Sequence, residues 1–93
     1  MVKALIVKPE DTVAVALAKI PAGEKVSLVL PSGEAIQEVM ALEEIPFAHK
    51  IAVHGTGRGE KVIRYGEVIG LAKEDIAKGR HVHVHNLQSS RFA

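Results

Sequence analysis

The 93-residue sequence contains no cysteine and no tryptophan, and its only aromatic side chains are Phe47, Tyr65 and Phe92. The lack of cysteine excludes disulfide bonds, zinc–thiolate sites and thiol catalysis. A metal bound by this chain would need histidine, carboxylate or water ligands. The shortage of aromatic side chains argues against stacking on the bases of single-stranded nucleic acid.

A long apolar run and a strong charge of one sign are also missing. No stretch approaches the roughly 18 consecutive apolar residues of a transmembrane helix, and the N-terminus shows no small-residue cleavage site. The formal net charge is +1, and the lysines and arginines are scattered singly, which argues against an electrostatic nucleic-acid binder. We therefore expect a cytoplasmic protein that binds neither nucleic acid nor a membrane.

The residues that are present suit a small β-rich domain. Hydrophobic residues make up 47% of the chain, so the core must consist of valine, isoleucine, leucine and alanine, and the β-branched members of this set favour strands. A chain of this length forms one domain and buries only about 60–65% of its unfolded surface. A partner chain or a second copy would be a natural supplement, so a homo-oligomer stays open.

Short apolar or alternating runs, each bounded by glycine, proline or polar residues, predict most of the elements. They predict strands over residues 4–7, 25–30, 35–42, 51–54, 61–64 and 67–72. The turn Pro31-Ser32-Gly33 joins the second and third of these strands into a hairpin. The fold class is therefore mainly β.

One or two short helices are expected between the strands. Val13, Ala16, Leu17 and Ile20 follow the helical spacing i, i+3, i+4 and i+7, which predicts a helix over residues 13–19. Asp11 or Thr12 can cap that helix. A single helical turn is expected over residues 73–77.

The pattern Gly-x-x-Val recurs after Gly23, Gly59 and Gly79. Glycine permits the positive φ of a turn, and the valine opens the next strand. The spacings of 36 and 20 residues differ, which argues against a solenoid. The repeats therefore predict turn-into-strand corners in a folded-over β structure.

Residues 80–87 read Arg-His-Val-His-Val-His-Asn-Leu, and this alternation has the period of a β-strand. It predicts one strand with His81, His83 and His85 on one face and the valines on the other. Imidazoles so arranged suit proton transfer, metal binding or anion recognition. They can equally form the solvated face of a surface strand, because same-face neighbours about 6.6 Å apart permit a metal site without requiring one.

A second group consists of His49, Lys50 and His54, around the strand predicted over residues 51–54. If this strand lies near the histidine-rich segment, up to five imidazoles and one lysine share a cleft. General-base, oxyanion-stabilising and carboxylate-binding roles are all available to such a set. The convergence of the two segments is a hypothesis at this point.

Several long motifs are chemically unusual: Ala-His-Lys-Ile-Ala at 48–52, Gly-Glu-Lys-Val-Ile-Arg-Tyr-Gly-Glu-Val-Ile-Gly at 59–70, and Asp-Ile-Ala-Lys-Gly-Arg-His-Val-His-Val-His-Asn-Leu at 75–87. Together with Asp-Thr-Val-Ala-Val-Ala-Leu at 11–17, they resemble the N-terminal domain of the altronate and D-galactarate dehydratase family. The resemblance implies a β-clip (SAF-like) fold. We expect this SAF-like domain over residues 1–88 and a flexible C-terminal tail over residues 89–93.

The resemblance also implies a function. In that family the domain is either the N-terminal part of a sugar-acid dehydratase or a small subunit beside a large catalytic chain, as in sulfolactate sulfo-lyase. The chemistry is β-elimination, in which a base removes the proton next to a carboxylate while hydroxide or sulfite leaves. We therefore expect part of a carbon–oxygen lyase acting on an altronate- or galactarate-like hydroxy acid, not catalytic alone. The family is associated with divalent iron or manganese, expected here with or on the large subunit, and no metal ligand is assigned to this chain.

Residue roles follow from placing these motifs on this sequence. We expect His83 and His85 to be catalytic, and His49, Lys50, His81 and Asn86 to contact the sugar-acid substrate. The sequence departs from the family pattern at Ala48, where glycine is common, and at residues 53–58, so substrate preference at that loop stays open. Two other readings also remain: a stand-alone module that binds a carbohydrate or an anion without catalysis, and a metal-binding domain that uses the histidines.

Overall fold

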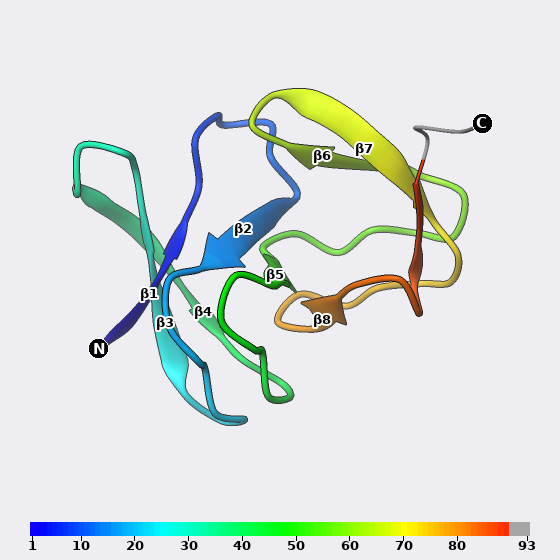
Figure 1. Cartoon of the computed structure of the whole chain (residues 1–93). Coiled ribbons are helices and arrows are strands. Elements are labelled where there is room, and N and C mark those ends of the chain that lie inside the picture. Colours follow the sequence, from blue (N-terminus) through cyan, green and yellow to red (C-terminus); the bar gives the residue numbers. More distant parts are fainter. Residues whose placement is uncertain (90–93) are drawn as a thin grey trace.

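The computed structural model describes residues 1–89, and within this range the chain forms nine strands and no helix (Figure 1). Residues 90–93, most of the expected tail, lie outside the described residues. No helix in the described range is long and apolar enough to cross a membrane. The strands are β1 (Val2–Leu5), β2 (Val13–Ala16), β3 (Lys25–Val29), β4 (Ala35–Met40), β5 (Lys50–Ala52), β6 (Lys61–Arg64), β7 (Glu67–Ala72), β8 (His81–Val82) and β9 (Leu87–Ser89).

The strands form two sheets, which confirms the mainly β prediction. One sheet has six strands in the order β4-β3-β1-β2-β5-β8, and the other has three in the order β6-β7-β9. The pairing of β1 with β3 is parallel, and the other pairings are antiparallel. The predicted hairpin is β3–β4, and the strands expected over 61–64 and 67–72 form the second hairpin, β6–β7.

Four similar corners connect the strands, over residues 17–24, 42–49, 53–60 and 73–80. Each corner contains a left-handed residue two positions before the next strand, and these are Gly23, Ala48, Gly59 and Gly79. The corners pair two by two through reciprocal backbone hydrogen bonds, between Ile20 and Ile45 (2.9 and 2.8 Å) and between Thr56 and Ile76 (2.9 and 2.7 Å). The Gly-x-x-Val repeats therefore mark the first, third and fourth corners, and they miss the second because Ala48 and Ile51 take the positions of the glycine and the valine there.

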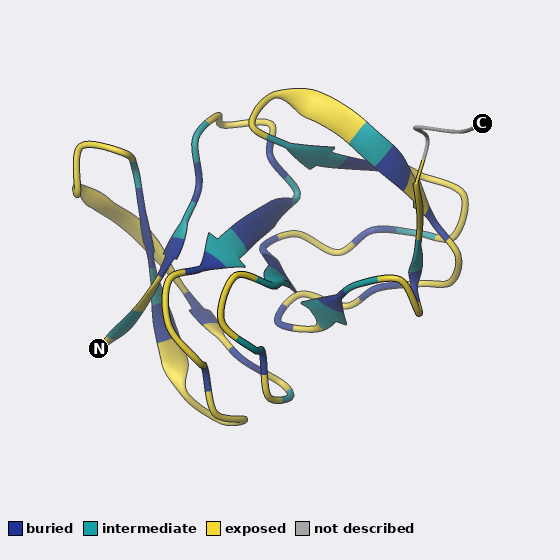
Figure 2. Ribbon diagram, in the orientation of Figure 1, coloured by how far each residue is buried: buried dark blue, intermediate teal, exposed yellow. Residues whose placement is uncertain are grey.

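Two packed clusters form the core, and β2 and β5 lie between them (Figure 2). Ile51 and Val53 belong to the larger cluster, whereas Ala52 between them belongs to the smaller one. Val13 and Ala14 on β2 divide in the same way. Both strands are thus buried on both faces, which holds the two hairpins on either side of them.

The expected helix over residues 13–19 is wrong, because Val13–Ala16 forms strand β2. A strand that is apolar on both faces has no alternation, so its sequence also satisfies the helical spacing. Residues 73–77 belong to the fourth corner and are not helical either. The buried Asp11 caps no helix; its carboxylate accepts hydrogen bonds from the backbone N–H groups of Val7 and Lys8 (3.1 Å each) and Gly66 (2.8 Å).

The prediction of a single strand that carries His81, His83 and His85 on one face is also wrong. Strand β8 ends at Val82, and a turn over residues 83–86 separates it from β9. Val84 is 70% exposed whereas Val82 is buried, so the two valines do not share a buried face. Strand β9 then pairs with β7 and reaches Ser89, the first residue of the expected tail.

The left-handed Ala48 yields a stability prediction. Its φ of 68° places an L side chain where such a backbone costs about 1–2 kcal/mol, whereas glycine loses about 0.4–1 kcal/mol through its freer unfolded chain. We therefore expect Ala48→Gly to raise the free energy of unfolding by about 0.5–1 kcal/mol, measured by urea denaturation.

The matched control is Gly59→Ala, at the same position of another corner. Gly59 has a φ of 82°, and an added Cβ would meet no atom within 4 Å, so only the backbone term changes. This variant should lose stability by a similar amount. A destabilised Ala48→Gly variant would show that the methyl group of Ala48 matters more than its backbone conformation.

Candidate functional site

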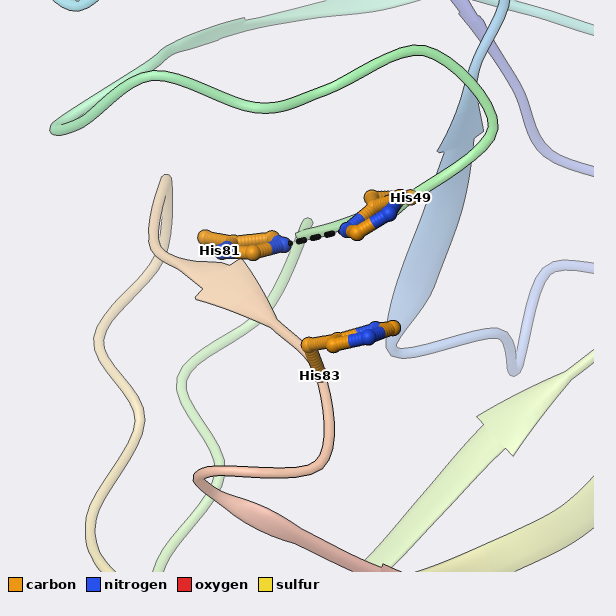
Figure 3. Close-up of side chains that lie close together, drawn as sticks. All are labelled: His49, His81 and His83. Atoms are coloured by element: carbon orange, nitrogen blue, oxygen red, sulfur yellow. Dashed lines mark hydrogen bonds between the residues drawn. The ribbon is translucent and has the colours of Figure 1, made fainter.

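The imidazoles of His49, His81 and His83 lie together at one end of the six-stranded sheet (Figure 3). His49 ends the second corner, immediately before β5, and His81 opens β8. The antiparallel pairing of β5 with β8 sets Ile51 opposite His81 and Lys50 opposite Val82. The predicted convergence of the two histidine-bearing segments is thus confirmed, although corners and a turn rather than one long strand bring it about.

Two of the rings are hydrogen-bonded and the third stacks on them. His49 Nδ1 lies 2.8 Å from His81 Nε2, and the ring of His83 stacks on that of His49 at 4.2 Å between centroids. One nitrogen of the hydrogen-bonded pair must donate a proton and the other must accept it. While this bond persists, His49 and His81 cannot both be protonated, so together they carry at most one positive charge.

Of the two remaining histidines, one lies near this cluster. The His85 ring centroid lies 5.3 Å from that of His81, and the side chain is exposed. His54 is exposed in the third corner and has no ring contact with the other histidines in the part of the chain that the structure describes. Four of the five imidazoles therefore gather, and we call His49, His81, His83 and His85 the histidine cluster.

Asn86 shapes the turn that carries these rings. Its side chain is buried, its Nδ2 donates to the carbonyl of His81 (2.8 Å), and its Oδ1 accepts from the backbone N–H of His83 (2.9 Å). Asn86 was expected to contact the substrate, but both ends of its side-chain amide are hydrogen-bonded to the backbone. Glu43 supports the same segment by accepting the backbone N–H of His81 at 3.0 Å.

Lys50, which directly follows His49, is the cation next to the cluster. Lys50 is half-buried at the start of β5, and burial followed by the positive charge of Arg64 lowers the pKa of its ammonium. Arg64 ends β6, and its guanidinium carbon lies 5.1 Å from the centroid of the Tyr65 ring. The sequence analysis missed Arg64, because a single arginine beside a hairpin turn reads as a solvated charge.

Backbone strain occurs at two positions, one of them directly before His49. Within residues 1–89, Ala48 and Tyr65 are the two non-glycine residues with positive φ, at 68° and 57°. Ala48 precedes His49, and Tyr65 follows Arg64. Such strain concentrates at functional positions, because elsewhere a residue that relieves it is preferred.

Burial and neighbouring rings keep two members of the cluster neutral near pH 7. Burial is the main cause that lowers the pKa of His81, and His49 is the next, while the carboxylate of Glu43 opposes them. Burial and then His49 also lower the pKa of His83, with a further contribution from the ammonium of Lys50. Neutral imidazoles can accept a proton or bind a metal.

One ring nitrogen from each of His49, His81 and His83 lies within 4.8 Å of the other two, which is close enough for one ion to reach all three. The same group can act in proton transfer, because neutral and hydrogen-bonded imidazoles both occur in it. Lys50, next to His49, adds the capacity to attract an anion. The geometry thus supports a shared polar site without selecting a substrate.

Comparison with known proteins gives a consistent result. Residues 2–90 match the family described as the altronate/galactarate dehydratase SAF domain. Altronate dehydratase of Escherichia coli (strain K12) is 40% identical over 80 residues, covering 86% of this chain and 15% of the relative. The (2R)-sulfolactate sulfo-lyase subunit alpha of Chromohalobacter salexigens is 40% identical over 50 residues, which cover 54% of this chain and 53% of that subunit.

The same subunit alpha of Paracoccus pantotrophus is 36% identical over 64 residues, covering 69% of this chain and 96% of the relative. This chain thus spans about 15% of the E. coli relative's length and about half of that of the Chromohalobacter subunit. The matched unit therefore occurs both inside a much longer chain and as nearly all of a separate subunit.

The lowered pKa values of His81 and His83 predict how stability depends on pH. An unfolded histidine titrates near pH 6.5, so between the folded and unfolded pKa values the unfolded chain binds more protons. The free energy of unfolding should therefore fall as the pH is lowered through about 6.5. Urea denaturation of the wild type and of His81→Gln checks this, because the variant should show a shallower fall. Identical pH dependences in the two proteins would contradict the assignment.

Proposed function

Because the chain belongs to the altronate/galactarate dehydratase SAF domain family, we propose that it is the small subunit or N-terminal domain of a lyase that eliminates water from a sugar-acid-type hydroxy acid. Its histidine cluster completes a site shared with a larger catalytic chain. The observation that carries the proposal is the hydrogen-bonded and stacked arrangement of His49, His81 and His83. The relatives support a larger partner chain, since the same unit is part of the longer altronate dehydratase and is nearly all of the sulfo-lyase subunit alpha.

The proposed reaction needs a base, an acid and groups that hold the substrate. His83 is the base, because its pKa is lowered and neither ring nitrogen has a hydrogen-bond partner among residues 1–89. It takes the proton from the carbon next to the carboxylate, and that electron pair forms the carbon–carbon double bond. The hydroxyl on the next carbon leaves as water with a proton from the exposed His85. The resulting enol then becomes a keto acid.

The other predicted residues hold the substrate or the site. The His49–His81 pair can hydrogen-bond a substrate hydroxyl or the enolate oxygen, and Lys50 can contact the carboxylate. For Asn86 we propose a positioning role, because both ends of its amide hold the backbone of His81 and His83.

The proposal is tested by purifying the chain from its native cell with an N-terminal tag, away from the cluster. We expect a larger chain in fixed ratio, and water elimination from a hydroxy acid such as D-altronate only when both chains are present. In that complex, His83→Ala should lower turnover about 10²–10⁴-fold through loss of general-base catalysis. Because His83 is only half-buried, this substitution should leave the unfolding temperature nearly unchanged.

His54→Ala is the matched control, because His54 is an exposed histidine outside the cluster. It should retain wild-type turnover. Equal turnover in His83→Ala and the wild type would rule out the base assignment. A chain that emerges without a partner would instead favour the second candidate, a stand-alone anion-binding module, for which the half-buried Lys50 beside the cluster is the supporting observation.

Divalent iron or manganese is a further proposal. The three clustered imidazoles fit part of a divalent ion's ligand set, and His49, His81 and His83 would each supply one nitrogen, so that His83 would hold the ion instead of acting as the base. When bound, such an ion supplies stabilisation of negative charge on a substrate oxygen. Imidazole suits iron, whereas manganese favours carboxylate and water ligands, and no carboxylate belongs to this three-residue group within residues 1–89.

We therefore expect the ion to be held together with, or by, the larger chain. Elemental analysis of untagged proteins should find iron or manganese in the complex and less than one equivalent in the 93-residue chain alone. The physical reason is that three neutral donors leave the charge of the ion uncompensated. One full equivalent in the isolated chain would place the metal site on this domain.

A further inference from the structure

His81 opens β8, and two side chains hold its backbone. Within residues 1–89, β8 is the last strand of the six-stranded sheet, and the carbonyl of Arg80 accepts a hydrogen bond from Ala52 on the β5 side (2.9 Å). Because peptide groups alternate in direction along an antiparallel strand, the N–H and C=O of His81 point away from β5. The carboxylate of Glu43 accepts that N–H at 3.0 Å, and the amide of Asn86 donates to that C=O at 2.8 Å. Side chains thus occupy the place of a neighbouring strand.

Glu43 belongs to the second corner, the one that ends at His49. Backbone hydrogen bonds fix this corner, since the N–H of His49 donates to the carbonyl of Pro46 (3.0 Å) and Ile45 exchanges two hydrogen bonds with the first corner (2.9 and 2.8 Å). The contact from Glu43 to the N–H of His81 therefore connects the corner that carries one ring with the backbone that carries the other. These two rings form the hydrogen-bonded pair, with 2.8 Å between His49 Nδ1 and His81 Nε2 (Figure 3).

The hydrogen bond to His81 is the main interaction of the Glu43 carboxylate. The oxygen that accepts it, Oε2, also lies 3.7 Å from Nη1 of Arg80, whose side chain is 53% exposed. An ion pair so open to water contributes little, whereas a hydrogen bond from an N–H to a carboxylate is among the stronger ones. The next residue, Glu44, instead pairs with the exposed Lys19 at 3.9 Å. Two adjacent glutamates of one corner thus differ in their contact with the histidine-bearing strand.

We propose that Glu43 is a positioning residue for the histidine cluster. Its carboxylate holds the backbone of His81 so that the ring nitrogen Nε2 stays within hydrogen-bonding distance of Nδ1 of His49. Glu43 acts through His81 and does not itself touch the substrate. Groups that orient a functional side chain in this way typically change activity about 10- to 100-fold when they are removed. The inference rests on the proposed function for the reaction in which the ring pair takes part.

Other contacts keep the fold together without this carboxylate. The second and fourth corners remain joined by the hydrogen bond from the N–H of Leu42 to the carbonyl of Gly79 (2.9 Å), and β5 remains paired with β8. Glu43 and His85 line one cavity of about 280 Å³, so water from this cavity can replace the carboxylate at the N–H of His81. Such a water satisfies the N–H but does not tie it to the second corner. Removal of the carboxylate should therefore separate the two rings before it unfolds the chain.

The first experiment observes the ring pair directly in the metal-free 93-residue chain. NMR of the nitrogen-labelled protein at about pH 8, where histidine is neutral, measures the scalar coupling that an N–H···N hydrogen bond transmits between His49 Nδ1 and His81 Nε2. The wild type should show this coupling, and Glu43→Ala should lose it. Glu43→Gln should keep it, because glutamine offers an acceptor oxygen at the same reach. Glu44→Ala is the matched control and should keep it as well.

The coupling separates positioning from a purely structural role, which would lower stability and leave the ring pair intact. A coupling of wild-type size in folded Glu43→Ala overturns the inference, and so does a wild-type chain without the coupling. If Glu43→Ala does not fold, Glu43→Asp takes its place. This variant keeps the charge, but its carboxylate is one methylene shorter, so it should lose the coupling too. A retained coupling in Glu43→Asp would then overturn the inference.

The second experiment measures steady-state kinetics of the complex with the larger chain, using D-altronate. Glu43→Ala should lower kcat about 10- to 100-fold with a smaller change in KM, because Glu43 orients the ring pair and does not contact the substrate. Glu43→Gln should recover most of kcat. Glu44→Ala should match the wild type in both constants.

The two experiments separate this inference from the proposed function. A wild-type kcat in Glu43→Ala overturns the positioning role and leaves the proposed function standing. A complex that supports no elimination removes the proposed function, while loss of the coupling in Glu43→Ala still upholds the positioning of the ring pair. A Glu43→Gln variant as slow as Glu43→Ala overturns the hydrogen bond as the cause.

Discussion

The pairing of β5 with β8 is the contact on which the site depends. It comprises only two residue pairs, and the fourth corner extends it through hydrogen bonds between Gly79 and Ala52 (2.8 Å) and between Ala52 and Arg80 (2.9 Å). Gly79 also needs its lack of a side chain, because a Cβ there would clash with the carbonyl of Met40. This short ladder sets His49 and His81 side by side and leaves no room for a register shift.

The stabilising groups and the functional groups are arranged differently. The two core clusters consist of apolar side chains only, and the buried carboxylate of Asp11 has three backbone donors. At the histidine cluster, by contrast, the non-glycine residue before His49 is left-handed, and Lys50 is in neither ion pair of residues 1–89. Energetically unfavourable backbone and charge arrangements thus occur where a bound ligand or a partner chain can compensate for them, as is typical of functional sites.

The repeated corners explain how a small chain builds such a site. Each corner turns one strand into the next with the same backbone hydrogen bonds, so the side chain that follows the left-handed residue has the same place in all four. That place holds Glu24, Glu60 and Arg80 in the first, third and fourth corners and His49 in the second. A structural repeat thus became specific through one residue, and the pairing of β5 with β8 brought that residue to His81.

The amino-acid sequence by itself determined those elements that depend on neighbouring residues. Glycine marked three of the corners, alternation and turn residues marked both hairpins, and the unusual histidine motifs indicated the family. Tertiary structure decided the rest. Val13–Ala16 is a strand because both of its faces are buried, and the histidine strand ends at Val82 because Asn86 folds the next residues into a turn. The meeting of His49 with His81 depends on the pairing of strands that are distant in the sequence, and no periodicity along a single segment encodes such a contact.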